Sequence, residues 1–131
     1  MFQIADNCIY DEIKILDIAS AKAQGLGEVV NDVFGFYLTK IDPTNDDLSD
    51  DGILIYRNRQ TYADKKTGSG EDIQAGEKLY YEVAESLVTP NKPSGTAGTE
   101  FYFCGWAKEA TTAAATKVLM NFDGTRQNED I

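Results

Sequence analysis

The residues most capable of chemistry in this chain are its 22 Asp and Glu side chains, because the sequence contains no histidine. Without an imidazole, a serine or cysteine nucleophile lacks a histidine base, and a metal site lacks its commonest nitrogen ligand. Two carboxylates about 5–9 Å apart could still support glycoside hydrolysis. With so many acids, a pair at that distance is expected by chance. The sequence therefore favours a protein without enzymatic activity, with a carboxylate-based hydrolase as an alternative.

A pattern typical of calcium ligands lies in the segment DLSDDG. Asp47, Ser49 and Asp51 would supply oxygen ligands at positions one, three and five of a calcium loop, with Gly52 at position six. The twelfth position falls on Asn58, where a bidentate Glu is expected, and a strand rather than a helix follows the loop. We therefore predict a solvated acidic loop and no metal or cofactor, with calcium binding as the alternative.

A second pattern, IQAGEKLYY, spans Ile73–Tyr81, where Gly76 suits a turn with positive φ and Leu79 an inward position. It is similar to points where a strand re-enters a small barrel, as in biotinyl or lipoyl carriers and β-clip modules. A carrier also needs a modified lysine on an exposed hairpin tip, flanked by Met or by Asp and Ala. The lysines near this pattern lack such flanks, so a carrier module is a lesser alternative: Lys65, Lys66 and Lys78.

Charge is distributed unevenly along the chain. The net charge is −10 and the calculated pI is about 4.3, which excludes nucleic acid as a direct partner because its phosphates attract basic surfaces. Residues 1–56 hold eleven acidic and three basic side chains, whereas residues 57–131 hold eleven and nine. This gradient predicts one acidic end that faces solvent and one more neutral end that docks on a partner.

The two cysteines, Cys8 and Cys104, fit no metal-ligand spacing. Cys104 lies in an apolar run and is expected to be buried, whereas the sequence leaves open whether Cys8 forms a disulfide. No run of about 18 apolar residues occurs, so we expect no membrane partner. The chain also begins without a basic and apolar leader, so we expect it to be made in the cytoplasm without export by a signal peptide.

Short apolar segments that end at glycine or proline must position all of these residues. Their β-branched and aromatic residues favour strands, and turn signals recur about every 8–12 residues, as in sandwiches and barrels. Residues 109–116, EATTAAAT, are predicted to be a short helix or a loop, and 42–52, 64–70 and 91–98 to be loops. Strands are expected within 1–20, in two parts of 27–41 hinged near Asn31 or Gly35, and at 53–59, 73–83, 87–89, 101–107 and 117–122.

The sequence thus predicts a mainly β protein with a single compact domain over residues 1–131, made of short antiparallel strands with at most one short helix. Residues 1–20 are expected to form an extended N-terminal arm, 21–124 the β core and 125–131 a polar tail. An aromatic set is expected to lie mostly in the core, with some members free to anchor an interface: Tyr56, Tyr62, Tyr80, Tyr81, Tyr102 and Trp106.

Glycine-led and apolar segments follow one another in a definite order: Gly27–Val30, Ile73–Tyr81, Val88–Thr89, Gly105–Ala107 and Val118–Phe122. Their order resembles that of small tailed-phage head decoration (capsid cement) proteins. The resemblance covers roughly residues 25–124 and rests on glycines and apolar positions rather than on catalytic residues. Tyr81 stands where the family commonly has Trp, and the acidic loop at 42–52 looks like an insertion.

The resemblance implies a β-tulip-like domain without enzymatic activity. Such a protein binds the outer surface of the major capsid protein lattice, stabilises the DNA-filled head and resides on the virion. It also implies self-association, as a trimer at three-fold positions or alternatively as a dimer. A virion-associated adhesive module that binds a host surface or glycan is the alternative from another binding class. The N-terminal arm is expected to add a strand to a capsid sheet edge, with contacts from Phe2, Gln3, Ile4, Ile9 and Tyr10.

Overall fold

A computed structural model of the chain describes residues 1–5, 10–45, 50–125 and 127. Within these ranges the fold is all-β, which confirms the predicted fold class, and residues 109–116 form turns and a single β-bridge rather than a helix. The predicted strands at 87–89 and 101–107 have the predicted bounds. The strands are β1 (Phe2–Ile4), β2 (Tyr10–Ile15), β3 (Gly27–Val30), β4 (Val33–Tyr37), β5 (Gly52–Asp64), β6 (Lys78–Glu82), β7 (Leu87–Thr89), β8 (Phe101–Ala107) and β9 (Lys117–Asp123).

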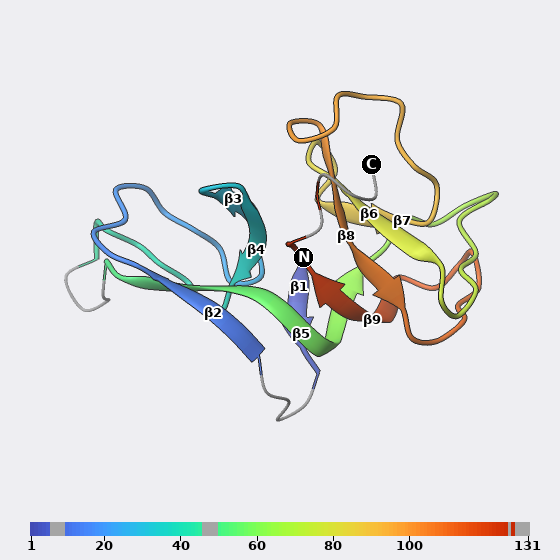
Figure 1. Ribbon diagram of the computed structural model, residues 1–131, viewed down its shortest axis with the longest axis horizontal. Helices are drawn as coiled ribbons and strands as arrows, with labels where there is room; N and C mark the ends of the chain where they lie inside the picture. The colour runs from blue at the N-terminus through green and yellow to red at the C-terminus, as the bar shows by residue number, and fades with distance from the viewer. Residues whose placement is uncertain (6–9, 46–49, 126, 128–131) are drawn as a thin grey trace.

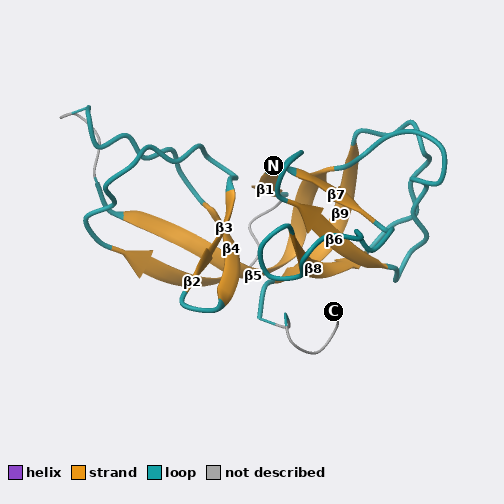
Figure 2. Ribbon diagram, turned by 90° about the horizontal axis from the view of Figure 1, so that it is seen from above, coloured by secondary structure: helices purple, strands orange, loops and turns teal. Residues whose placement is uncertain are grey.

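All strand pairs are antiparallel, in one curled sheet with the order β3-β4-β5-β9-β8-β6-β7, and β1 and β2 both pair with β5. Figures 1 and 2 show two lobes joined by β5. The N-terminal lobe comprises β2, β3, β4 and the first half of β5. The C-terminal lobe comprises β1, the second half of β5 and β6 to β9. β5 therefore belongs to both lobes and holds them in one domain.

Two register shifts in the pairing of β5 coincide with this division. One occurs against β2 between Asp11 and Glu12, and the other against β9 between Asn58 and Thr61. An extra residue on one strand of an antiparallel pair bends that strand and increases its twist. The thirteen-residue β5, predicted as the shorter strand 53–59, can therefore change direction and pair with strands of both lobes in succession.

The main core lies where the lobes meet and is rich in aromatic rings. Phe2 contributes a ring at 4.9 Å from that of Phe122 and 5.4 Å from that of Phe36, and Phe34 stacks on Tyr102 at 4.8 Å. These rings come from β1, β4, β8 and β9, so the strands of both lobes share one apolar cluster. Aromatic pairs at such centroid separations are favourable beyond the area that they bury.

Two smaller clusters flank the main core. The N-terminal lobe has its own cluster of Ile18, Tyr37, Ile41 and Leu54, against which Ile13, Ile15, Leu26 and Val30 pack. In the C-terminal lobe a third cluster combines Tyr80, Phe101 and Phe103 with the half-buried Trp106. The aromatic set of the sequence is thus mostly buried or half-buried, with Tyr62 exposed.

The hinge predicted near Asn31 or Gly35 lies at Asn31. Asn31 and Asp32 have φ values of 49° and 71° and connect β3 to β4 in a two-residue hairpin. Positive φ at both central residues is the requirement of a tight hairpin turn, and Asn and Asp tolerate it better than most residues. Gly35 lies inside β4, where a Cβ atom would be 2.5 Å from the carbonyl oxygen of Ile55.

The N-terminal segment is extended as predicted, but it is paired within the fold. β1 and β2 both pair with β5, and the backbone N–H of Phe2 donates to the carbonyl of Gly25 at 3.0 Å. The Phe2 side chain is 3% exposed in the main core. β1 and β2 are therefore part of the folded sheet. Separately, across the described ranges no helix is long and apolar enough to cross a bilayer.

Candidate binding surfaces

Two long connections meet at the end of the C-terminal lobe that lies to the right in Figure 1. They are residues 65–77, between β5 and β6, and residues 108–116, between β8 and β9; we call this surface the loop face. Backbone hydrogen bonds join the two connections, from Gly68 N–H to the Ala113 carbonyl at 3.1 Å and in both directions between Ile73 and Thr111 at 2.9–3.0 Å. The loop face is thus a hydrogen-bonded layer.

A buried lysine fixes the two connections further. The Lys65 side chain is 2% exposed, and its ammonium donates to the carbonyl oxygens of Lys66 at 2.7 Å, Ala115 at 3.0 Å and Thr112 at 3.3 Å. Three donors meet three acceptors, so the buried charge is satisfied. Burial lowers the pKa of the Lys65 ammonium, against the opposing effect of the negative charges of Glu71 and Asp72.

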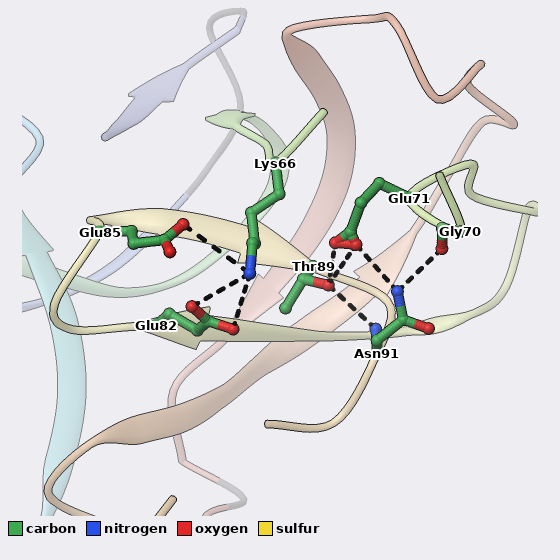
Figure 3. A network of polar contacts seen from close by, with 7 residues as sticks. All are labelled: Lys66, Gly70, Glu71, Glu82, Glu85, Thr89 and Asn91. Carbon is green, nitrogen blue, oxygen red and sulfur yellow. Dashed lines mark hydrogen bonds and ion pairs between the residues drawn. The ribbon is translucent and has the colours of Figure 1, made fainter. Parts of the chain in front are cut away.

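Figure 3 shows the polar network on the adjoining part of this surface. The Glu71 carboxylate, 7% exposed, accepts from the Thr89 hydroxyl at 2.6 Å and from Asn91 Nδ2 at 2.8 Å. Asn91 Nδ2 also donates to the Gly70 carbonyl at 2.8 Å, and the Asn91 backbone N–H donates to Thr89 Oγ1 at 3.1 Å. The network therefore ties the 65–77 connection to the end of β7.

Part of the loop face is lined by small uncharged residues, although Asp72, Lys108 and Glu109 are also exposed on the two connections. Thr67, Gly68, Ala114 and Thr116 are exposed around a shallow apolar depression, and Ala113 is half-buried. A depression that is hydrogen-bonded underneath and lined by small uncharged side chains loses little entropy or hydration when another protein covers it. The loop face can therefore act as a preorganised docking surface.

A second concave surface lies where β5 bends between the lobes. It is a groove of about 600 Å³ that Tyr10, Arg57, Asn58 and Asp123 help to line. Arg57 forms ion pairs with Asp11 at 3.5 Å and with Asp123 at 3.8 Å. Arg59 also lines the groove, so two basic and two acidic side chains balance there.

The floor of this groove contains a buried amide. Asn58 is 2% exposed; its Oδ1 accepts from the Thr61 hydroxyl at 2.6 Å, and its Nδ2 has no partner among the described residues. A buried donor without a partner is costly, and here it lies at the register shift that bends β5. The Asn58 side chain is therefore part of the buried structure at the bend in β5.

The predicted contact residues do not form one surface. Phe2 and Ile4 point toward the main core because alternate residues of β1 share a face, so Phe2 is not available to a partner and that expectation is corrected. Gln3 is exposed on the opposite face of β1, and Tyr10 is exposed beside the groove. Ile9 lies outside the described residues. The apolar-polar-apolar order of Phe2, Gln3 and Ile4 was the signal for this burial.

Asp47 and Ser49, half of the predicted calcium pattern, lie outside the described residues. Asp51 Oδ1 accepts from the Asp17 backbone N–H at 3.2 Å. Asn58, the expected twelfth position, lies inside β5 with its amide oxygen bonded to Thr61, so it does not point back toward the acidic loop. Within the described ranges no three acidic, cysteine or histidine side chains converge on a common point.

The described cysteine, Cys104, is fully buried, which confirms its predicted place in the core. Its thiol donates to the Leu79 carbonyl at 3.3 Å, and burial raises the pKa of the thiol. A thiol that stays protonated and inaccessible is a poor nucleophile. Cys8 lies outside the described residues.

In comparisons with known proteins, the chain matches no protein-family model, and no curated protein is significantly similar to it.

Proposed function

We propose that this protein is a non-enzymatic decoration protein of tailed-phage heads, which binds the outer surface of the major capsid protein lattice and stabilises the DNA-filled head. The observation that carries the proposal is the loop face, a hydrogen-bonded surface with a depression lined by small uncharged residues, on the lobe whose sequence is more nearly neutral. The C-terminal sequence, with eleven acids and nine bases, is nearly neutral, whereas residues 1–56 hold eleven acids and three bases.

The segments that resemble decoration proteins support the proposal through their backbone geometry. Gly76 has a φ of 87° in the turn before β6, and Gly105 has a φ of 132° with a Cβ position that would lie 2.0 Å from the Asn121 carbonyl oxygen. The positive φ favours glycine at both positions, and at Gly105 the close backbone contact also excludes a side chain. The glycines of the resemblance therefore have definite structural roles in forming the C-terminal lobe that presents the loop face.

In this proposal each copy docks its loop face on the capsid and leaves its acidic lobe toward solvent. A single contact of modest area is weak, but copies that each bridge neighbouring capsid subunits reinforce one another through the lattice. The outward negative charge keeps particles apart in solution. The protein then resides on the virion surface after synthesis in the host cytoplasm. The partners in this reading are the major capsid protein and further copies of this chain.

Co-sedimentation with heads of the tailed phage whose genome encodes the chain tests the proposal. We expect the protein to pellet with heads and to saturate at a fixed number of copies per head. Ala114→Glu should weaken binding by about tenfold or more, because docking would bury an unpaired carboxylate. Ala19→Glu, the same change at an exposed alanine of the N-terminal lobe, is the matched control and should bind normally.

Failure of the protein to pellet with heads at any concentration would overturn the proposal. Equal binding by the two variants would show that another surface docks on the capsid. Binding to host cells instead of heads would identify the adhesive module that the sequence left as an alternative.

A further inference from the structure

One edge of the strand β2 has no backbone partner within the described part of the chain. In Figure 1 it lies at the lower margin of the N-terminal lobe, with β5 along one side of it. Among the described residues, the backbone groups of Tyr10–Ile15 bond to no strand other than β5. The N–H and C=O groups that point away from β5 are therefore a template for one further strand.

The side chains along β2 divide into two rows. Ile13 and Ile15 point inward and pack against the small core of the N-terminal lobe. Because side chains alternate along a strand, the outer row is Tyr10, Glu12, Lys14 and then Leu16, which follows the strand directly. Leu16 is 61% exposed and Tyr10 is 36% exposed, so this row begins and ends with an exposed apolar side chain.

We propose that two copies of this chain associate through these edges, with their β2 strands antiparallel around a two-fold axis and Ile13 opposite Ile13 of the second copy. In this register Glu12 lies opposite Lys14 of the second copy, and Lys14 opposite its Glu12. Tyr10 and Leu16 meet in the same way at each end. The exposed apolar groups thus cover one another, and the charged groups between them form two pairs of opposite sign.

The neighbouring registers lack this match. In an antiparallel pair around a two-fold axis perpendicular to the sheet, directly opposite residues point to the same face. One residue must therefore lie opposite its own copy, and the neighbouring registers are centred on Glu12 or on Lys14. Centring the pair on Glu12 places two glutamates opposite each other, and centring it on Lys14 does the same with two lysines. Like charges directly opposite are destabilising. The sequence of β2 is therefore self-complementary in one register, as an isologous interface requires.

The charges on β2 also discourage other strands. Charged side chains are a common means by which edge strands avoid indiscriminate pairing. An arbitrary apolar strand would leave Glu12 and Lys14 without partners, whereas a second copy provides both. The second copy is thus the occupant that the charge pattern favours.

We expect the dimer to be reversible. A contact limited to two strands buries less than the roughly 1,200 Å² of a standard stable interface. The acidic residues of the two N-terminal lobes also repel each other, although salt limits that repulsion to about 8 Å at physiological ionic strength. This inference does not rest on the proposed function, because β2 and the loop face lie on different lobes. It predicts a two-fold dimer in solution rather than the trimer that the resemblance implies.

Sedimentation equilibrium of the full chain tests the inference, over about 10 µM to 1 mM at physiological salt. We expect a monomer–dimer equilibrium. Glu12→Lys alone and Lys14→Glu alone should each weaken the dimer by about tenfold or more, because each puts like charges opposite each other twice. The double variant E12K/K14E restores both pairs and should recover the original affinity to within about threefold. Asp72→Lys, an exposed charge change of the same size on the other lobe, is the control.

Cross-linking fixes the register independently of charge. In a Cys8→Ser background, Ile13→Cys should form an intermolecular disulfide on mild oxidation, because opposed residues bring their Cβ atoms within about 5.5 Å. Ile15→Cys should not form this disulfide, because residue 15 of the second copy would lie four positions away along the paired strand. A protein that stays monomeric at 1 mM, a double variant that does not recover, or equal cross-linking at both positions would each overturn the inference.

Discussion

The two lobes are stabilised in different ways. The C-terminal lobe contains most of a fourteen-residue apolar cluster together with the hydrogen-bonded loop face, whereas the N-terminal lobe has four buried apolar residues of its own. The N-terminal lobe compensates by inserting Phe34 and Phe36 of β4 into the main core and by sharing β5. The N-terminal lobe is thus held in place largely by the aromatic rings of Phe34 and Phe36, which pack in the main core.

Two polar contacts, one in each lobe, differ in how far apart their partners lie in the sequence. In the N-terminal lobe, the Glu28 carboxylate accepts from Lys22 at 2.8 Å and from the Tyr37 hydroxyl, and burial with this partner raises the pKa of Tyr37. These contacts link residues close in sequence. In the C-terminal lobe Lys65 bonds to Thr112 and Ala115, about fifty residues further along the chain. The Glu28 contacts are thus local, whereas the Lys65 contacts join two loops that are far apart in the sequence.

Phe34→Ala should have the largest effect, because Phe34 belongs to β4 but packs in the main core. Removal of a fully buried Phe costs about 3–5 kcal/mol of unfolding free energy. We expect both lobes to unfold together at a lower urea concentration. Fluorescence of the single tryptophan, Trp106, reports the C-terminal lobe, and far-UV circular dichroism reports the whole chain. Non-coincident transitions would show that the lobes are independent.

Ile41→Ala should have a smaller and more local effect. Ile41 is buried in the small N-terminal core, and we expect a cost of about 2 kcal/mol, near the lower end for this change because a small cluster can collapse. Amide exchange should accelerate in β3 and β4 and change little in β8. Ile73→Ala is the matched control in the C-terminal lobe, since both isoleucines are buried and lie in isolated β-bridges. Equal acceleration in both lobes would contradict local stabilisation.

Asp64→Asn should have the smallest effect, at the contact that fixes the N-terminus to the C-terminal lobe. Asp64 accepts from the terminal amine at 3.0 Å and from Lys117 at 2.6 Å. Burial acts to raise the pKa of Asp64, but these hydrogen bonds and charges outweigh it and hold the pKa below its ordinary value of 3.8. The contact is partly exposed, so its contribution should stay below about 1 kcal/mol.

The pH dependence of this variant follows from the sign of the shift. A carboxyl whose pKa is lower in the folded state stabilises the fold above its unfolded pKa and loses that effect as pH falls through the folded value. The melting temperature of D64N should therefore lie slightly below that of the wild type at pH 7, and the difference should vanish near pH 2. A difference that persists in acid would assign the effect to packing.

Local patterns predicted much of the fold. The bounds of β7 and β8, the turn at Asn31 and the burial of Cys104 follow from apolar runs and turn residues over a few positions. The full length of β5 was missed, because its second half carries polar residues whose pairing with β9 depends on residues sixty positions away. Such pairings cannot be read from a local window.

The candidate surfaces were less predictable than the strands. The gradient of charge indicated one acidic and one neutral end, but not that the neutral end would be two connections fixed by a buried lysine. Lys65 lacks any sequence signal for burial, since lysine is seldom buried without partners. The unpaired edge of β2 also could not be predicted, because an edge strand is recognised only once the pairing of all the described strands is known.

By itself the sequence determined an all-β chain of short strands, its turns, and the uneven charge along it, because these depend on residues that are neighbours in the chain. The tertiary structure decided that Phe2 is a core residue, that β5 bends to serve two lobes, and that one edge of β2 has no partner among the described strands. These features depend on which distant segments pair and pack, and burial of apolar rings between them is the physical reason that one such arrangement is selected.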